Sequence, residues 1–269
     1  MLDYYCVTNT FSHSHGSCDK VKPKNKWIYS APNDIEYPVL FVDNYIPHSL
    51  NTEYKNKFGW MSESSEIISS CCSWIKSNVK LVEDNFKKIF VNDISFLELS
   101  DVFEYVSPGS NMPWVKEYFV RPKTKLVSII ASSKNWTHGH RLRHEIVKNN
   151  PTIDAYGGGY KKVEHKEEAL DDYMFSYCIE NGKYDLYYTE KLTDCIATGT
   201  IPIYWGSDKI SDVFNTKGFI LYDNIVDGFE LNEDLYESMI GYAKENLEIL
   251  KSLKCSDDII QEKIKENYK

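Results

Sequence analysis

The stretch MFSYCIENGKYDLYYTEKLTDCIATGTIPIYWG, residues 174–206, contains a strand, a helix and a second strand in succession. Its two ends, MFSYCIEN and IPIYWG, have the short, apolar composition of buried strands. Between them, Thr189 suits the N-cap of a helix and Gly199 suits the residue that ends it. The apolar residues of this helix recur every four positions, at Tyr188, Leu192 and Ile196. This spacing predicts one buried helix face, as in a β-α-β unit of a parallel sheet.

The same alternation of strands and helices extends over the second half of the chain. KLVSIIASS (125–133) is a nearly continuous apolar run, which is typical of a buried parallel strand. Further strands are predicted in TIDAYGGG (152–159) and GFILYD (218–223), and a long amphipathic helix over 231–254. The pattern favours a doubly wound parallel α/β sheet.

The first half of the chain alternates in the same way but is shorter. Its strand candidates are KWIYSA (26–31), YPVLFVDNYI (37–46), KKIFVND (87–93) and VFEYVSP (102–108). Turn-forming residues then accumulate in SPGSNMPW (107–114), and VRPKTK (120–125) contains another proline. We therefore predict two domains, 1–120 and 121–269, with the second one ending in helices.

Composition argues against several classes of protein. The formal net charge is −9 over 269 residues, which disfavours a general nucleic-acid binder. The seven cysteines are odd in number and include no C-x-x-C pair, so neither a disulfide framework nor a zinc site is expected. No stretch approaches the roughly 20 apolar residues of a membrane span. These features predict a soluble, cytoplasmic chain; a membrane-anchored parent from which the anchor was removed is the alternative.

A metal site is not predicted either. No D-x-D motif lies at a strand end. His13 and His15 form one histidine pair, and His140 and His144 lie one helical turn apart, but no third ligand accompanies them.

The quoted stretch places two charged residues, Glu190 and Lys191, in the first turn of its helix. Ligands of parallel sheets bind beyond the carboxyl ends of the strands, here on loops 132–141, 156–160 and 180–190. A helix N-terminus favours anions, Lys191 adds a charge suited to a phosphate, and Glu190 can accept hydrogen bonds from vicinal sugar hydroxyls. An ordinary helix start explains the same residues, because a first-turn Glu complements the helix dipole and a neighbouring Lys is usually solvated.

Several separated motifs resemble those of the α-1,3/4-fucosyltransferases, glycosyltransferase family ten. CIENGKYDLYYTEKLTDCIATGTIPIYWG is similar to the family pattern of a strand ending in F-E-N-S, then Y-x-T-E-K-L and G-T-V/I-P-V. KLVSIIASSKNWTHGHRLRHEIV and IDAYGGG resemble the preceding strand-loop-helix and strand of that family. The resemblance covers residues 122–225, and it departs from the pattern at Ile179 and Gly182.

The resemblance implies a GT-B-like α/β architecture: two Rossmann-like domains facing a cleft, the N-terminal one small. Domain 1–120 would lie on the acceptor side, and domain 121–269 would bind the donor, GDP-fucose, with no other cofactor. The family's roles for matching residues put Arg141 and Lys191 on the diphosphate and Glu190 on the ribose. Asn181 and Tyr187 would line the nucleotide site. The further candidates for donor contacts are Arg143, which competes with Arg141, and Glu180 and His138.

The implied reaction inverts the anomeric centre without a metal, while a carboxylate deprotonates a hydroxyl of a glycan acceptor. Glu63, in the turn of FGWMSESSEI (58–67), resembles the family's catalytic Glu. Glu66 is more simply a helix-capping residue, and Glu98 and Glu104 have no supporting motif. Two other functions stay open: a transferase for another nucleotide sugar, and an inactive sugar-nucleotide or glycan-binding module.

Overall fold

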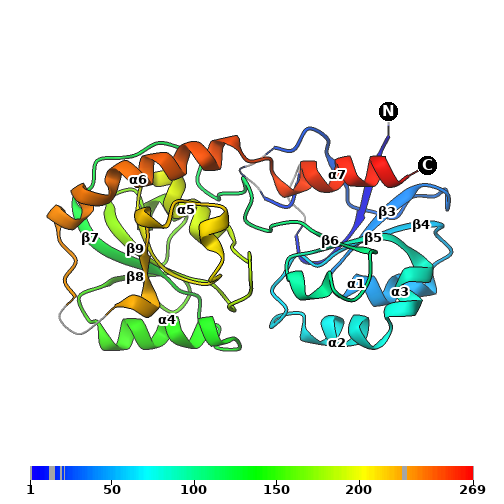
Figure 1. Cartoon of the computed structure of the whole chain (residues 1–269), viewed down its shortest axis with the longest axis horizontal. Helices are drawn as coiled ribbons and strands as arrows, with labels where there is room; N and C mark the ends of the chain where they lie inside the picture. The colour runs from blue at the N-terminus through cyan, green and yellow to red at the C-terminus, as the bar shows by residue number, and fades with distance from the viewer. Residues whose placement is uncertain (1, 12–15, 19, 21, 226–228, 269) are drawn as a thin grey trace. The chain divides into compact units, whose positions relative to one another are not determined.

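The structure is a computed structural model that describes residues 2–11, 16–18, 20, 22–225 and 229–268. It consists of two compact units (Figure 1). Unit 1 runs to Pro108 and also includes the chain from Lys254 on, whereas unit 2 is Gly109–Leu253. The structure thus divides the chain at 108/109, against the boundary expected near residue 120. It also joins the last helix to unit 1, because the apolar face of that helix is buried in the core of unit 1.

Unit 1 has a parallel sheet of six strands in the order β2-β1-β3-β4-β5-β6. Its strands are β1 (Tyr4–Val7), β2 (Trp27–Ile28), β3 (Pro38–Val42), β4 (Asn56–Trp60), β5 (Phe86–Val91) and β6 (Phe103–Tyr105). Its α-helices are α1 (Tyr45–His48), α2 (Ser69–Ser77), α3 (Val79–Asn85) and α7 (Ser256–Asn267).

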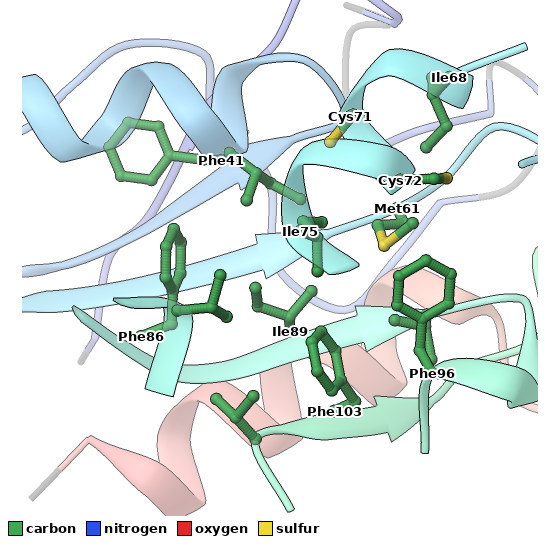
Figure 2. Packing of buried hydrophobic residues seen from close by; sticks show 14 of the residues in the cluster. Phe41, Met61, Ile68, Cys71, Cys72, Ile75, Phe86, Ile89, Phe96 and Phe103 are labelled. Carbon is green, nitrogen blue, oxygen red and sulfur yellow. The ribbon is translucent and has the colours of Figure 1, made fainter. Parts of the chain in front are cut away.

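Alternate residues of the strands of unit 1 enter two separate cores. Val39 and Phe41 of β3 pack with residues of α2 and α3, and Figure 2 shows Phe41 in this cluster with Ile75 of α2. Leu40 and Val42, which point to the opposite face, belong to the cluster that includes the buried residues Ile260 and Ile264 of α7. Both faces of the sheet are therefore covered, as parallel sheets require.

Unit 2 has a parallel sheet of five strands in the order β11-β10-β9-β7-β8. Its strands are β7 (Lys125–Ile130), β8 (Asp154–Tyr156), β9 (Tyr173–Ile179), β10 (Ile201–Trp205) and β11 (Ile220–Leu221). Its α-helices are α4 (His138–Asn149), α5 (Glu190–Thr198) and α6 (Glu233–Ser252). The sequence-based prediction of α/β units with parallel sheets is confirmed.

The helix of the quoted stretch has the caps that its sequence predicts. The Thr189 side chain accepts a hydrogen bond from the amide of Lys191, and Gly199 ends α5 with a left-handed φ of 70°. The predicted apolar face of this helix is buried, with Leu192 and Ile196 in one cluster with Cys178 of β9. On the other face of the sheet, where Figure 1 shows α4, Ile179 packs with Ile146 of that helix.

Candidate functional site

The strand order of unit 2 reverses between β7 and β9. From β7 the chain goes to β8 on one side, and it then returns to β9 on the other side of β7. Open α/β sheets bind ligands at such a switch point, beyond the carboxyl ends of the two strands. Helix α4 begins after β7, and α5 begins after β9. The two helix N-termini carry most of the residues predicted to bind the donor.

The first turn of α4 lies directly against the end of β9. Thr137 caps this helix, since its hydroxyl accepts from the His140 amide at 3.1 Å and its own amide donates to His140 Nδ1 at 3.3 Å. The Gly139 amide donates to the carbonyl oxygen of Asn181 at 3.1 Å. A Cβ atom on Gly139 would overlap the carbonyl oxygen of Glu180. A glycine is therefore required for α4 to approach β9 this closely.

The two arginines of α4 have different environments. Arg143 is buried and donates from Nε and Nη2 to the carbonyl oxygen of Ile179, at 2.9 and 2.6 Å. Its Nη2 also donates to Oδ1 of Asn181 at 2.9 Å. Arg141 is exposed, and its Nη1 donates to the carbonyl oxygen of Trp136 at 3.1 Å. Arg143 thus orients the Asn181 side chain, whereas Arg141 keeps an accessible guanidinium beside the loop that follows β7.

The exposed ring of His138 extends this site toward β10. It stacks on Trp205 with 5.1 Å between the ring centroids and 21° between the planes. Trp205 also lines a pocket at the ends of β10 and β11, together with Lys183, Ser207 and Asp223.

Glu180 holds the start of α5 through hydrogen bonds to its N-cap residue. Its fully buried carboxylate accepts from the Thr189 amide at 2.8 Å and from the Thr189 hydroxyl at 2.7 Å. Lys191 Nζ lies 3.0 Å from the same hydroxyl and 3.6 Å from Glu180 Oε2. Glu180 therefore holds the N-cap in place, and through the cap it positions Lys191.

The sequence interpretation missed two residues, Lys166 and Asp194, which form a charged cluster with Glu190 at the start of α5. Lys166 lies in the 3-10 turn η3 (Lys166–Ala169), and its Nζ is 2.6 Å from Asp194 Oδ2 and 3.2 Å from Glu190 Oε1. One signal could have indicated this pair. Glu190 and Asp194 lie four residues apart on one helix face, and because two like charges at that spacing repel each other, a neighbouring cation is favoured.

The two carboxyl groups of this cluster have opposite pKa shifts. Burial and the charge of Glu190 raise the pKa of Asp194 to about 6, although Lys166 opposes the rise. Burial also disfavours ionised Glu190, but the charges of Lys166 and Lys191 hold its pKa well below the usual range. Glu190 is therefore a carboxylate at neutral pH and can accept hydrogen bonds from a ligand.

Tyr187 has little surface to offer a ligand in this structure. Only 1% of its surface is exposed, and its ring makes an edge contact with the half-buried ring of Tyr184 at 5.5 Å between centroids. The preceding Leu186 has a φ of +60°, an uncommon backbone conformation for a bulky residue. The loop after β9 thus packs Tyr187 inward and leaves Tyr184 nearer the surface.

In unit 1, Glu63 lies in a turn at the carboxyl edge of the sheet. Asp43, which follows β3, is buried, and its Oδ1 accepts from the amides of Ser62 at 2.8 Å and Glu63 at 3.2 Å. Asn92, which follows β5, donates to the carbonyl oxygens of the same two residues at 3.1 and 2.8 Å. The turn that carries Glu63 is therefore held by polar side chains from both neighbouring strands.

The other three candidates for the catalytic base, Glu66, Glu98 and Glu104, lie in different environments from Glu63. Glu104 of β6 pairs with Lys263 of α7 at 2.7 Å. Glu66 and Glu98 are exposed.

No group of three or more potential metal ligands occurs among the residues that the structure describes. His13 and His15 lie outside the described residues. All seven cysteines are buried, and no disulfide bond joins any of them in the described part of the chain. Within the described parts of the chain, no helix combines the length and apolar character needed to cross a membrane.

Known proteins resemble parts of this chain in sequence and nearly all of it in fold. Residues 120–250 match the family described as "Glycosyltransferase family 10 (fucosyltransferase) C-term". Across 62 residues the chain is 45% identical to an alpha-(1,3)-fucosyltransferase of Helicobacter pylori, covering 23% of this chain and 13% of that protein. Across 149 residues it is 26% identical to a putative fucosyltransferase of Acanthamoeba polyphaga mimivirus, covering 46% of this chain and 24% of that protein.

A solved structure of an alpha1,3-fucosyltransferase has the same fold. It aligns with a TM-score of 0.52 and 15% identity, over 99% of this chain and 89% of that one. The chain spans less than a quarter of the length of each of these two curated relatives. The resemblance of the motifs and the predicted GT-B-like α/β class are confirmed.

Proposed function

We infer the chemistry of this chain from the premise that its residues 120–250 belong to glycosyltransferase family 10. We propose that it transfers fucose from GDP-fucose to a hydroxyl group of a glycan acceptor, with inversion at the anomeric carbon. Unit 2 binds the donor, and unit 1 supplies the acceptor side. One observation supports the donor site above all: ionised Glu190 and Lys191 share the first turn of α5, at the switch point of a parallel sheet.

The charges at the two helix N-termini suit a nucleoside diphosphate. Lys191, the N-terminal amides of α5 and the exposed Arg141 are suited to the phosphates, whose negative charge increases as the sugar leaves. Glu190 accepts hydrogen bonds from the ribose hydroxyls. Asn181, whose Oδ1 accepts from Arg143, follows the end of β9.

Glu63 is the proposed catalytic base. Its carboxylate takes the proton of the acceptor hydroxyl while that oxygen forms a bond to the anomeric carbon of fucose. The bond between the anomeric carbon and the β-phosphate oxygen breaks in the same step, and GDP leaves. Asp43 accepts a hydrogen bond from the Glu63 turn and Asn92 donates one to it, and these bonds support the assignment because they hold the turn in place.

Thermal unfolding with a set of nucleotides tests the donor assignment. GDP at about 100 times its Kd should stabilise the fold by about 2.7 kcal/mol and raise the melting temperature by roughly 5–10 °C. UDP and CMP should do less. The Lys191→Ala variant should lose about 10- to 100-fold in GDP affinity, since it lacks a charged hydrogen bond. Lys148→Ala, an exposed change in the last turn of α4, is the control.

A larger thermal stabilisation by UDP than by GDP would favour the alternative transferase for another nucleotide sugar.

The Glu63→Gln variant tests whether Glu63 is the catalytic base, and comparing its transfer rate with that of the unaltered chain tests the inactive-module alternative. It should bind GDP-fucose normally and lower the transfer rate by roughly 10²- to 10⁴-fold. Normal transfer by this variant would rule out Glu63 as the base.

A further inference from the structure

Lys166 joins three segments of unit 2 at the edge of the candidate donor site. Its Nζ contacts Asp194 in the second turn of α5 and Glu190 in the first turn, at 2.6 and 3.2 Å. The same Nζ lies 5.3 Å from the centroid of the Trp114 ring. Its side chain is 23% exposed, and the side chain of Glu190 is 27% exposed. The buried end of the cluster is thus Asp194, and its accessible end is Glu190.

We propose that Lys166, anchored by Asp194, is a positioning residue for the donor: it orients the Glu190 carboxylate toward the ribose hydroxyls of the nucleotide. This inference rests on the proposed function. Lys166 lies 24 residues before Glu190 and 28 residues before Asp194 in the sequence. None of the sequence motifs connects Lys166 to these two residues.

Asp194 is the anchor because its carboxylate is used inside the protein. It is 1% exposed, one oxygen accepts from the Trp114 amide, and the other binds Lys166. No oxygen of a carboxylate so enclosed is presented to a ligand. Its negative charge instead holds the Lys166 ammonium in a partly buried place, where a charge without a partner would be costly.

Glu190 is the residue on which this anchor acts. Lys166 and Lys191 both approach its Oε1, at 3.2 and 3.5 Å. Two cations on one oxygen restrict the rotation of the carboxylate, and we assign Oε2 to the hydroxyls of the ligand. Lys166 is less well placed than Lys191 to bind phosphate, because its Nζ is held at 2.6 Å by Asp194 and at 3.2 Å by Glu190. Lys191 Nζ lies farther from its two neighbouring carboxylates, at 3.5 and 3.6 Å.

Calorimetric titration of the full chain with GDP and with 2′,3′-dideoxy-GDP tests this role. Lys166→Met should weaken GDP binding by about tenfold, the effect of losing one charged hydrogen bond, and should change dideoxy-GDP binding less than about threefold. Glu190→Gln should show the same selectivity. The double variant Lys166→Met/Glu190→Gln should bind GDP within about threefold of Glu190→Gln alone, because both changes remove one interaction.

Three further variants complete the experiment. Lys166→Arg should recover most of the GDP affinity, and Lys162→Met, an exposed change of the same charge nearby, should leave it unaltered. If Lys166→Met does not fold, Lys166→Met/Asp194→Asn removes both charges of the buried pair. This variant should also lose more affinity for GDP than for dideoxy-GDP.

Equal weakening of the binding of both nucleotides, or additive losses of GDP affinity in the Lys166/Glu190 double variant, would overturn the positioning role. Failure of the wild-type chain to bind GDP would instead overturn the proposed function and this inference with it.

Discussion

At the scale of single residues, Gly139 makes the close approach of α4 to β9 possible. Replacing a helical glycine with alanine ordinarily stabilises a helix by about 1 kcal/mol. Gly139→Ala should instead lower the free energy of unfolding by about 1–3 kcal/mol, because its Cβ would overlap the Glu180 carbonyl and force backbone atoms apart. Urea denaturation measures the change. The separation should also weaken GDP binding, since Arg143 would lose the Ile179 carbonyl.

The control for this prediction is a glycine in an open helix position. Gly241 of α6 has no atom within 4 Å of a built Cβ, so Gly241→Ala should stabilise the protein by up to about 1 kcal/mol. If Gly139→Ala were as stabilising as Gly241→Ala, the inference that α4 approaches β9 too closely for a Cβ atom at position 139 would be refuted.

At the scale of the secondary-structure element, the N-terminus of α4 depends on a neutral histidine. Burial, and then the charge of Arg143, lowers the pKa of His140 to about 4 from the usual 6.5. His140 Nδ1 can accept from the Thr137 amide only while it is unprotonated. The unfolded chain binds a proton near pH 6.5 and the folded chain only near pH 4. The contribution of His140 to stability is therefore complete above pH 6.5 and is lost as the pH falls toward 4.

His140→Gln should remove this pH dependence while keeping the cap, because glutamine suits the same position of a capping box. In the parent protein, up to about 3 kcal/mol of unfolding free energy should disappear between pH 6.5 and pH 4. Urea titrations at several pH values measure both proteins. His48→Gln, an exposed change in unit 1, should leave the slope unaltered. If the free energy of unfolding fell as steeply from pH 6.5 to pH 4 in His140→Gln as in the parent protein, the neutral-histidine cap would be refuted.

At the scale of the whole molecule, unit 1 is assembled from both ends of the chain. Ile260 and Ile264 of α7 are buried in one cluster with Tyr4 and Trp27, and Asp257 accepts hydrogen bonds from Ser17 and from the Trp27 indole. Each buried isoleucine contributes roughly 1.5–3 kcal/mol. A fragment of residues 1–253 should therefore lose the thermal transition of unit 1, or show it at a much lower temperature, in differential scanning calorimetry.

The same fragment contains all of unit 2, which provides an internal control. Its GDP-dependent transition should persist, because the candidate donor residues lie between His138 and Asp194. In the full chain, Ile264→Ala should destabilise unit 1 alone by about 2–5 kcal/mol. An unchanged unit 1 transition in the fragment would show that α7 is dispensable for its core.

Local features of this protein were determined by the sequence alone. The caps of α5 at Thr189 and Gly199, its buried face and the alternation of strands and helices all follow from short-range backbone and hydrophobic rules. The family motifs were readable for the same reason, since most of them lie within one strand, loop and helix.

Which side chains meet depends on the tertiary packing. Arg141 and Arg143 are about 200° apart around α4, and the sequence could not tell which of them would be buried against β9. The pairing of Lys166 with Glu190 and Asp194, and the return of α7 to unit 1, join residues that are distant along the chain. Contacts of this kind depend on how whole elements pack, because packing, unlike helix capping or hydrophobic periodicity, leaves no periodic signal in the sequence.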